Sequence, residues 1–203
     1  MARRIQSLDE LRRPARLASL PATRAAAPAA AVRILGIDPG SRFTGWGVIE
    51  ARGAKLTHIA SGCIRTGEGV LPPRLRLIHE GLAAVIAEHS PAEYAVEEVF
   101  MRVNVGTALI LGQARGVAVL AGALAGLPFA EYAPAQIKRA LVGNGRAEKA
   151  QIQHMVKLLL GLQGEMATEL GADAADALAI AICHAHVRGT LSRGDAALKK
   201  TWG

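Results

Sequence analysis

The sequence is poor in cysteine and in aromatic residues. Its two cysteines, Cys63 and Cys183, lie in apolar segments, and no C-x-x-C spacing occurs. This excludes a disulfide-stapled secreted scaffold, so we predict buried free thiols in a reducing compartment, the cytoplasm. Aromatic residues make up 3% of a chain that is 51% hydrophobic. The core must therefore be built mainly from aliphatic side chains and alanine, as in a compact α/β domain.

The first 31 residues lack a long apolar run, which excludes a secretory signal. Pro14, Pro21 and Pro28 argue against one continuous helix there. We predict that residues 1–31 are a disordered or mis-started extension. No internal repeat or linker follows, so the prediction is one domain of ordinary size over residues 32–190 and a flexible basic tail over 191–203.

The chain has an excess of basic residues, 24 Lys and Arg against 17 Asp and Glu, and a net charge of +7. Six of the arginines precede residue 32, where only two acids lie, so the remainder carries +3. A basic surface permits a polyanionic partner such as nucleic acid, although charge alone does not identify one.

Hydrophobic periodicity and turn residues predict an order of three strands, a helix, a strand, a helix, a strand and then further helices. The expected strands are 33–38, 44–50, 55–66, 94–100 and 129–133, and the expected helices are 72–90, 106–126, 134–143, 147–160 and 173–187. The fold class is therefore α/β.

Residues 106–126 are apolar over a length that could span a membrane. Arg115 lies near the middle, where inserting an arginine into a membrane costs about 2.5–3.5 kcal/mol, and glycines interrupt the segment. We predict no membrane span. The spacing Gly112-x-x-x-Gly116 instead favours a helix that approaches a sheet or a partner subunit closely.

Asp38 ends the first strand and is followed at once by Pro39 and Gly40. An isolated aspartate in this position is usually a turn residue that bonds to its own backbone. A catalytic interpretation requires that other carboxylates converge on it.

Further candidates lie on the fourth strand and the last helix. Glu97 and Glu98 point to opposite faces of their strand, and alternation alone does not choose between them. Asp173 and Asp176 share one face at the start of an apolar helix, where one acid would suffice as a cap. Carboxylates gathered without matching cations repel one another, and hard divalent cations such as Mg²⁺ or Mn²⁺ relieve this repulsion.

Several linked motifs resemble those of the RuvC Holliday-junction resolvases, in the same order along the chain. The similar region covers about residues 33–188, and its motifs are Gly-Ile-Asp-Pro-Gly-Ser-Arg-x-Thr-Gly-x-Gly at 36–47, Ser-Gly-Cys-Ile-Arg-Thr at 61–66, Ala-Val-Glu-Glu-Val-Phe at 95–100, Leu-Gly-Gln-Ala-Arg-Gly at 111–116 and Ala-Asp-Ala-Ala-Asp-Ala at 172–177.

The resemblance implies an RNase H-like fold with a central mixed five-stranded sheet flanked by helices, and a homodimer that nicks two opposing strands of four-way junction DNA. It also implies that Asp38, Glu97, Asp173 and Asp176 are the metal-binding catalytic acids, since the family's acid lies three residues before the Phe. Two Mg²⁺ ions per active site, with Mn²⁺ able to substitute, would yield 5′-phosphate and 3′-hydroxyl ends. Partnership with the RuvA and RuvB branch-migration proteins is implied in the same way.

The resemblance assigns DNA contacts to four further residues, each with a simpler alternative. Phe100 is similar to an aromatic that the family inserts near opened base pairs, or it is a core residue. Lys138 and Lys149 resemble basic residues that meet phosphates, or they are solvated lysines. Arg115 has either DNA phosphate or a buried acid as its partner.

Three other classes of protein share part of this pattern. The Gly-Ile-Asp-x-Gly-Ser opening also resembles the first phosphate motif of actin-like ATPases, but the chain is too short for their two lobes. RNase H-like nucleases that process pre-ribosomal RNA have a similar first strand but lack the motif at 111–116. A non-catalytic junction-binding protein would be expected to have lost at least one of the four acids.

Overall fold

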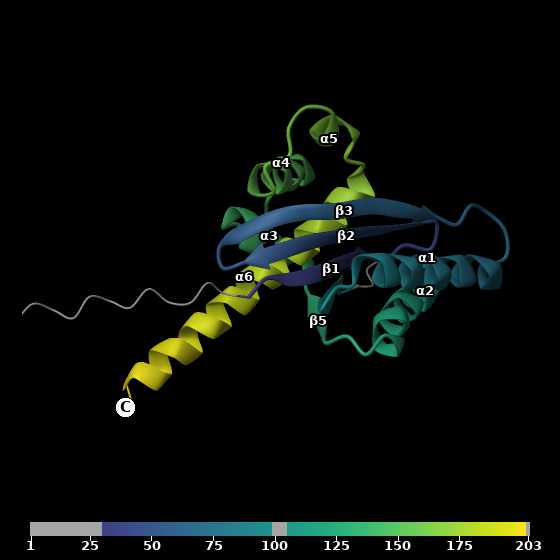
Figure 1. Ribbon diagram of the computed structural model, residues 1–203. Helices are drawn as coiled ribbons and strands as arrows, with labels where there is room; N and C mark the ends of the chain where they lie inside the picture. The colour runs from purple at the N-terminus through teal and green to yellow at the C-terminus, as the bar shows by residue number, and fades with distance from the viewer. Residues whose placement is uncertain (1–29, 99–104, 202–203) are drawn as a thin grey trace, which may run out of the picture.

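A computed structural model describes residues 30–98 and 105–201 of the chain, with side chains up to residue 190. Figure 1 shows a sheet between helices. The described elements are β1 (Val32–Asp38), β2 (Phe43–Arg52), β3 (Lys55–Arg65), α1 (Leu71–His89), β4 (Glu93–Glu97), α2 (Val105–Leu124), β5 (Phe129–Tyr132), α3 (Pro134–Val142), α4 (Lys149–Leu159), α5 (Gly164–Glu169) and α6 (Ala172–Thr201).

The sheet is mixed, with strand order β3-β2-β1-β4-β5. The first three strands form an antiparallel meander, whereas β4 pairs parallel to β1 and β5 parallel to β4. The expected mixed five-stranded sheet flanked by helices is confirmed. Because β1 and β4 are parallel neighbours, their carboxyl ends, which carry Asp38 and Glu97, meet at one edge of the sheet.

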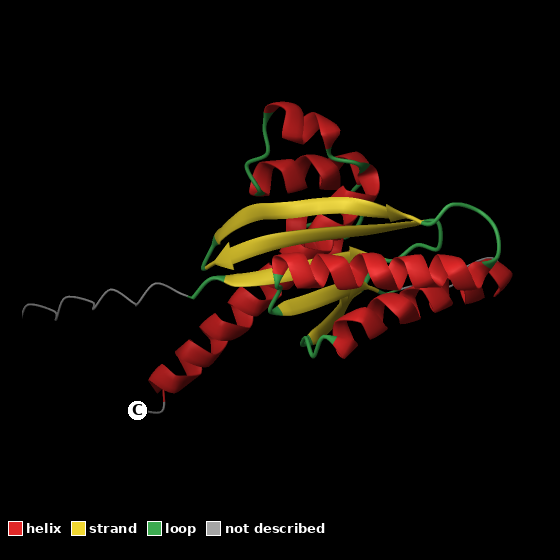
Figure 2. Cartoon of the chain, turned by 45° about the vertical axis from the view of Figure 1, so that its right-hand side comes forward, coloured by secondary structure: helices red, strands yellow, loops and turns green. Residues whose placement is uncertain are grey.

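Alternating side chains of the strands feed two cores. On one face Leu35, Val96 and Tyr94 pack against α1 and α2. On the other face Ile34 and Ala95 pack against α3, α4 and α6. In Figure 2, turned by 45°, α1 and α2 lie together on one side of the sheet while α6 crosses the other side and continues past it.

Glycines let α6 lie directly on β1 and β2. A methyl group at Gly36 would stand 2.1 Å from the carbonyl oxygen of Ala177, and one at Gly45 would stand 2.0 Å from that of Asp173. Such distances are far below ordinary contact, so only glycine allows this approach. The start of α6, with Asp173 in its first turn and Asp176 just after it, is thereby brought down onto the end of β1.

The structure differs from the sequence prediction by more than two residues at three places. Residues 164–169 form α5, where we expected a loop, because six residues are too few for a visible apolar period. Strand β4 ends at Glu97 rather than at residue 100, and residues 99–104 lie outside the described part. Helix α6 continues to Thr201 instead of ending near residue 187. Whether residues 191–203 are flexible stays a prediction.

Candidate active site

The acid predicted at the end of β1 lies beside the first turn of α6. Asp38 pairs in the sheet with Gly45, the glycine on which the backbone of Asp173 rests. Thr44 donates a hydrogen bond of 2.7 Å to the carbonyl oxygen of Gly40 and so holds the turn after Asp38. Asp38 is therefore part of an acidic cluster as well as a turn.

The packing of β4 distinguishes Glu97 from Glu98. Glu97 has the same side-chain parity as Ala95, which packs in the core on the α6 side. Glu98 has the parity of Tyr94 and Val96, which pack against α1 and α2. Glu97 thus shares the face of the sheet that bears Asp38 and α6, whereas Glu98 faces away from it.

The cluster is short of positive charge. Burial, together with the negative charges of Glu97, Asp176 and Asp173, raises the pKa of Asp38 from 3.8 to about 7. Burial and the charge of Asp176 likewise raise the pKa of Glu97. A group of carboxylates that holds a proton near neutral pH is a candidate functional site.

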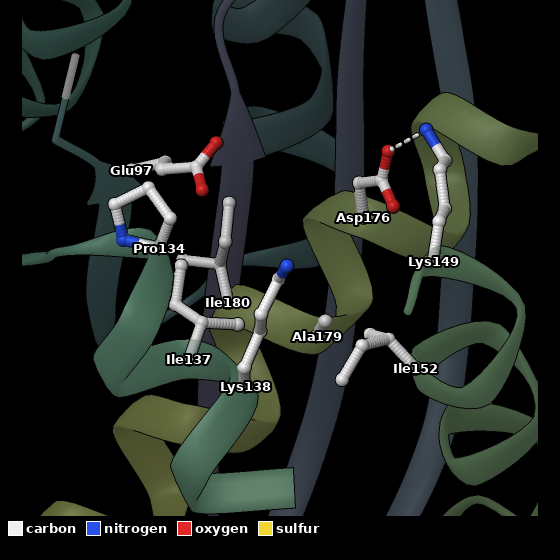
Figure 3. A pocket seen from close by; sticks show the side chains of 9 residues that line it. All are labelled: Glu97, Pro134, Ile137, Lys138, Lys149, Ile152, Asp176, Ala179 and Ile180. Atoms are coloured by element: carbon white, nitrogen blue, oxygen red, sulfur yellow. Dashed lines mark hydrogen bonds and ion pairs between the residues drawn. The ribbon is translucent and has the colours of Figure 1, made fainter. Parts of the chain in front are cut away.

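Glu97 and Asp176 line a pocket with a volume of about 220 Å³, and two lysines line it with them (Figure 3). Lys149, the first residue of α4, places Nζ 2.6 Å from Oδ2 of Asp176, and this hydrogen bond raises the pKa of the lysine. Lys138 comes from α3, and its ammonium group points into the space between Glu97 and Asp176. Both predicted lysines therefore accompany the acids.

Cys63 is a site residue that the sequence reasoning missed. We expected a buried thiol, but the side chain is only partly buried, and its Sγ lies 3.5 Å from Oδ2 of Asp173. Burial and the charge of Asp173 raise the pKa of this thiol to about 11, so it stays a neutral donor. No local sequence signal indicates this contact, because it depends on the pairing of Cys63 with Gly45 across β2 and β3. Cys183 is buried as predicted, and both thiols are free.

Arg115 has an acid as its partner, but this acid is exposed and not buried as expected. Its guanidinium forms an ion pair with Glu131 of β5, and its Nε donates a 3.4 Å hydrogen bond to the backbone carbonyl of Glu97. The arginine thus ties α2 to the end of β4, where a catalytic candidate lies. Phe100, the predicted aromatic contact, lies outside the described residues.

A polar network joins α6 to strands β4 and β5. His184 bonds through Nδ1 to the Tyr132 hydroxyl at 2.7 Å and through Nε2 to Glu93 at 2.8 Å. Arg188 donates to the other oxygen of Glu93 at 2.8 Å. Burial raises the pKa of Glu93, but these hydrogen bonds outweigh it, so the pKa is lowered. His186, two residues further along α6, bonds instead to the backbone carbonyl of Ala140.

The donor set suits a hard divalent cation, because it consists of carboxylate oxygens that repel one another. Within residues 30–98 and 105–190, however, no three His, Cys, Asp or Glu side chains stand close enough together to hold a metal ion as they are. Lys149 instead supplies positive charge to Asp176. The residues therefore fit a metal in kind, and binding would require the carboxylates to draw together.

An acid-lined edge with adjacent lysines, on a mixed five-stranded sheet between helices, defines an RNase H-like nuclease. The chain belongs to the family described as "Crossover junction endodeoxyribonuclease RuvC", whose model matches residues 34–184. Family membership makes the chain a crossover junction endodeoxyribonuclease and confirms both the resemblance and the fold. The nucleases of this family are metal-dependent.

Individual relatives agree with this assignment. A crossover junction endodeoxyribonuclease RuvC of Shewanella frigidimarina is 51% identical over 171 residues, which cover 84% of this chain and 96% of the relative. That of Methylococcus capsulatus is 55% identical over 161 residues, covering 79% and 94%. The solved structure of T. thermophilus RuvC in complex with Holliday junction substrate superimposes with a TM-score of 0.73 at 34% identity. The superposition covers 78% of this chain and 96% of that one.

Proposed function

We propose that this chain is a structure-specific endonuclease that resolves Holliday junctions by paired symmetrical nicks, in homologous recombination and DNA repair. The observation that carries the proposal is the convergence of Asp38, Glu97, Asp173 and Asp176 beside Lys138 and Lys149, in a chain of the RuvC family. The solved structure of a relative, T. thermophilus RuvC, in complex with Holliday junction substrate supports the choice of substrate.

In this proposal the four acids hold two Mg²⁺ ions, which Mn²⁺ can replace. When bound, such ions supply an activated water and charge stabilisation at the leaving 3′ oxygen, so the products carry 5′-phosphate and 3′-hydroxyl ends. The chain itself provides the rigid setting. Asp38 and Glu97 end adjacent strands, and Arg115 anchors the backbone of Glu97. Gly36 and Gly45 let the start of α6 pack directly on the sheet.

Lys149 and Lys138 serve as contacts to DNA phosphate in the same proposal. Lys149 is exposed at the mouth of the pocket and pairs with Asp176 in the absence of DNA. A metal ion would take over the charge of Asp176, which would release the ammonium group toward a phosphate oxygen. The proposed contact of Arg115 with DNA competes with its ion pair to Glu131, so we assign it mainly to positioning. The role of Phe100 in opening base pairs is retained as part of the proposal.

We further propose that the enzyme is a homodimer whose contact includes α2. This is the one helix of the described residues that is long and apolar enough to cross a membrane, with a mean hydropathy of 1.5, yet it packs along α1 and is anchored through Arg115. Several of its large apolar side chains are exposed: Val105, Leu109, Ile110, Leu120 and Leu124. A second copy would cover them and set two active sites against two strands.

The RuvA and RuvB branch-migration proteins as partners, and the cytoplasm as the location, belong to the same proposal. Both rest on family membership alone. Co-sedimentation of the purified proteins on a four-way junction would test the partnership.

The decisive experiment uses purified protein with Mg²⁺ on an end-labelled synthetic four-way junction, beside linear duplex and structured RNA. The expected result is a pair of symmetrical nicks on the junction alone, absent from Asp38→Asn. Cleavage of RNA with an untouched junction would reassign the chain to RNA processing. Binding without cleavage would leave a junction-recognition protein.

A further inference from the structure

We propose that Phe43 and Arg65 form a second DNA contact beside the acids, in which Phe43 stacks on an unpaired base of the junction and Arg65 meets the adjacent phosphate. The inference rests on the proposed function, since it names how that site holds its DNA strand. It concerns two residues at the start of β2 and the end of β3.

The register of the sheet puts this pair next to the acidic cluster. Gly45 pairs with Cys63, and both face Asp173. The next pair on the same face, two residues along each strand toward the acidic edge, is Phe43 with Arg65. At about 3.4 Å per residue, it lies about 7 Å beyond the glycine that supports Asp173. A DNA strand whose scissile phosphate lies at the acids would therefore pass over Phe43 within about one nucleotide of that phosphate.

Phe43 is exposed although the two residues before it are held by hydrogen bonds. Half of its surface is accessible, at 50%. Thr66 donates from its hydroxyl to the carbonyl of Ser41 at 2.7 Å, Arg74 donates to the same oxygen at 2.6 Å, and the Thr66 amide donates to the carbonyl of Arg42 at 3.1 Å. The backbone that carries the aromatic ring is therefore fixed in position. A rigid apolar ring left in water beside a charged site is suited to stacking on a base.

The charge of Arg65 is available to a ligand. Its side chain is exposed, and none of the acids in the described part of the chain pairs with it. Its neighbour Arg42, by contrast, forms an ion pair with Glu68. An aromatic ring beside a cation is the combination that binds unpaired nucleic acid, because every base has a π-face and every nucleotide a phosphate.

The first test measures junction affinity by fluorescence anisotropy, with full-length protein carrying Asp38→Asn so that no cleavage occurs. We expect Phe43→Leu to weaken binding roughly 5- to 100-fold, the range for loss of one base–aromatic stack, and Phe43→Trp to retain it. Phe129→Leu is the matched control, because Phe129 is 45% exposed but begins β5 at the opposite edge of the sheet, where it contacts Tyr94. Substituting an exposed side chain should leave folding intact.

The second test concerns Arg65 and the position of the base. Arg65→Gln should lower the slope of log affinity against log salt by about 1, whereas Arg52→Gln, at the other end of β2, should leave the slope unchanged. A 2-aminopurine placed at the junction centre should be quenched on binding by the Asp38→Asn protein and by its Phe43→Trp derivative, and less so by its Phe43→Leu derivative.

Equal affinity of Phe43→Leu and its parent, with unchanged quenching, would overturn this inference while leaving the junction as substrate. Failure of the Asp38→Asn parent to prefer a junction over duplex would instead remove the proposed function on which the inference stands.

Discussion

Replacing Asp38 with Asn should stabilise the metal-free protein at neutral and higher pH. The pKa of Asp38 is about 7 when folded against 3.8 as a free side chain, so the folded state binds the proton more tightly than the unfolded state. Stability is therefore lost as the pH rises from about 4 to about 7, and the loss is complete above pH 7. A rise in pKa from 3.8 to about 7 corresponds to about 4 kcal/mol of folding free energy at most. Asparagine has nearly the same shape and carries no charge, so the variant should escape this loss.

The assay is urea unfolding in the presence of a chelator at pH 8 and at pH 5. The advantage of Asp38→Asn should approach about 4 kcal/mol at pH 8 and shrink to about 1.5 kcal/mol at pH 5. Glu80→Gln, an exposed carboxylate of α1, is the control and should change little at either pH. Added Mg²⁺ should stabilise the parent more than the variant, since ligands stabilise the state that binds them. A variant no more stable than its parent at pH 8 without metal would refute the view that the acids repel one another.

Three further predictions follow from the contacts of α6. Gly45→Ala should reduce single-turnover cleavage about 100-fold or more with junction binding retained, because its methyl would stand 2.0 Å from the carbonyl oxygen of Asp173 and displace it by about 1 Å; Gly171→Ala, where a methyl meets open space, should cleave normally. Lys149→Met should tighten Mn²⁺ binding to the DNA-free protein, measured by calorimetry, while slowing cleavage, because Asp176 loses its internal counterion; unchanged affinity would contradict this. Tyr132→Phe should lower the free energy of unfolding by about 1 kcal/mol in a urea titration, since His184 loses one hydrogen bond, and no change would mean that the bond contributes nothing.

Sequence reasoning located the strands well because their boundaries depend on local chemistry. Asp38 was placed at a strand end by the apolar run before it and the Pro39-Gly40 turn after it, and the structure agrees. Asp173 and Asp176 were placed on one helical face by their spacing alone. These features need only a few neighbouring residues.

Other features depend on packing between distant segments, which one sequence does not specify. The choice between Glu97 and Glu98 depends on which face of β4 meets α6, and alternation is the same for both. The contact of Cys63 with Asp173 spans 110 residues and needs the register of β2 and β3. The ion pair of Arg115 with Glu131 requires the parallel pairing of β4 and β5 beside α2.

The polar network around His184 fixes the position of α6 along β4, so the length of helix between His184 and Asp176 decides where Asp176 lies. Glu93 and Glu97 are four strand residues apart, about 13 Å, and Asp176 and His184 are eight helical residues apart, about 12 Å in the opposite direction. When Glu93 holds His184 at one end of these two elements, Glu97 and Asp176 are therefore level at the other end. An insertion or deletion anywhere between Asp176 and His184 would rotate and shift the acids even if every residue of the pocket were kept. The length of this stretch of helix is thus a property of the active site.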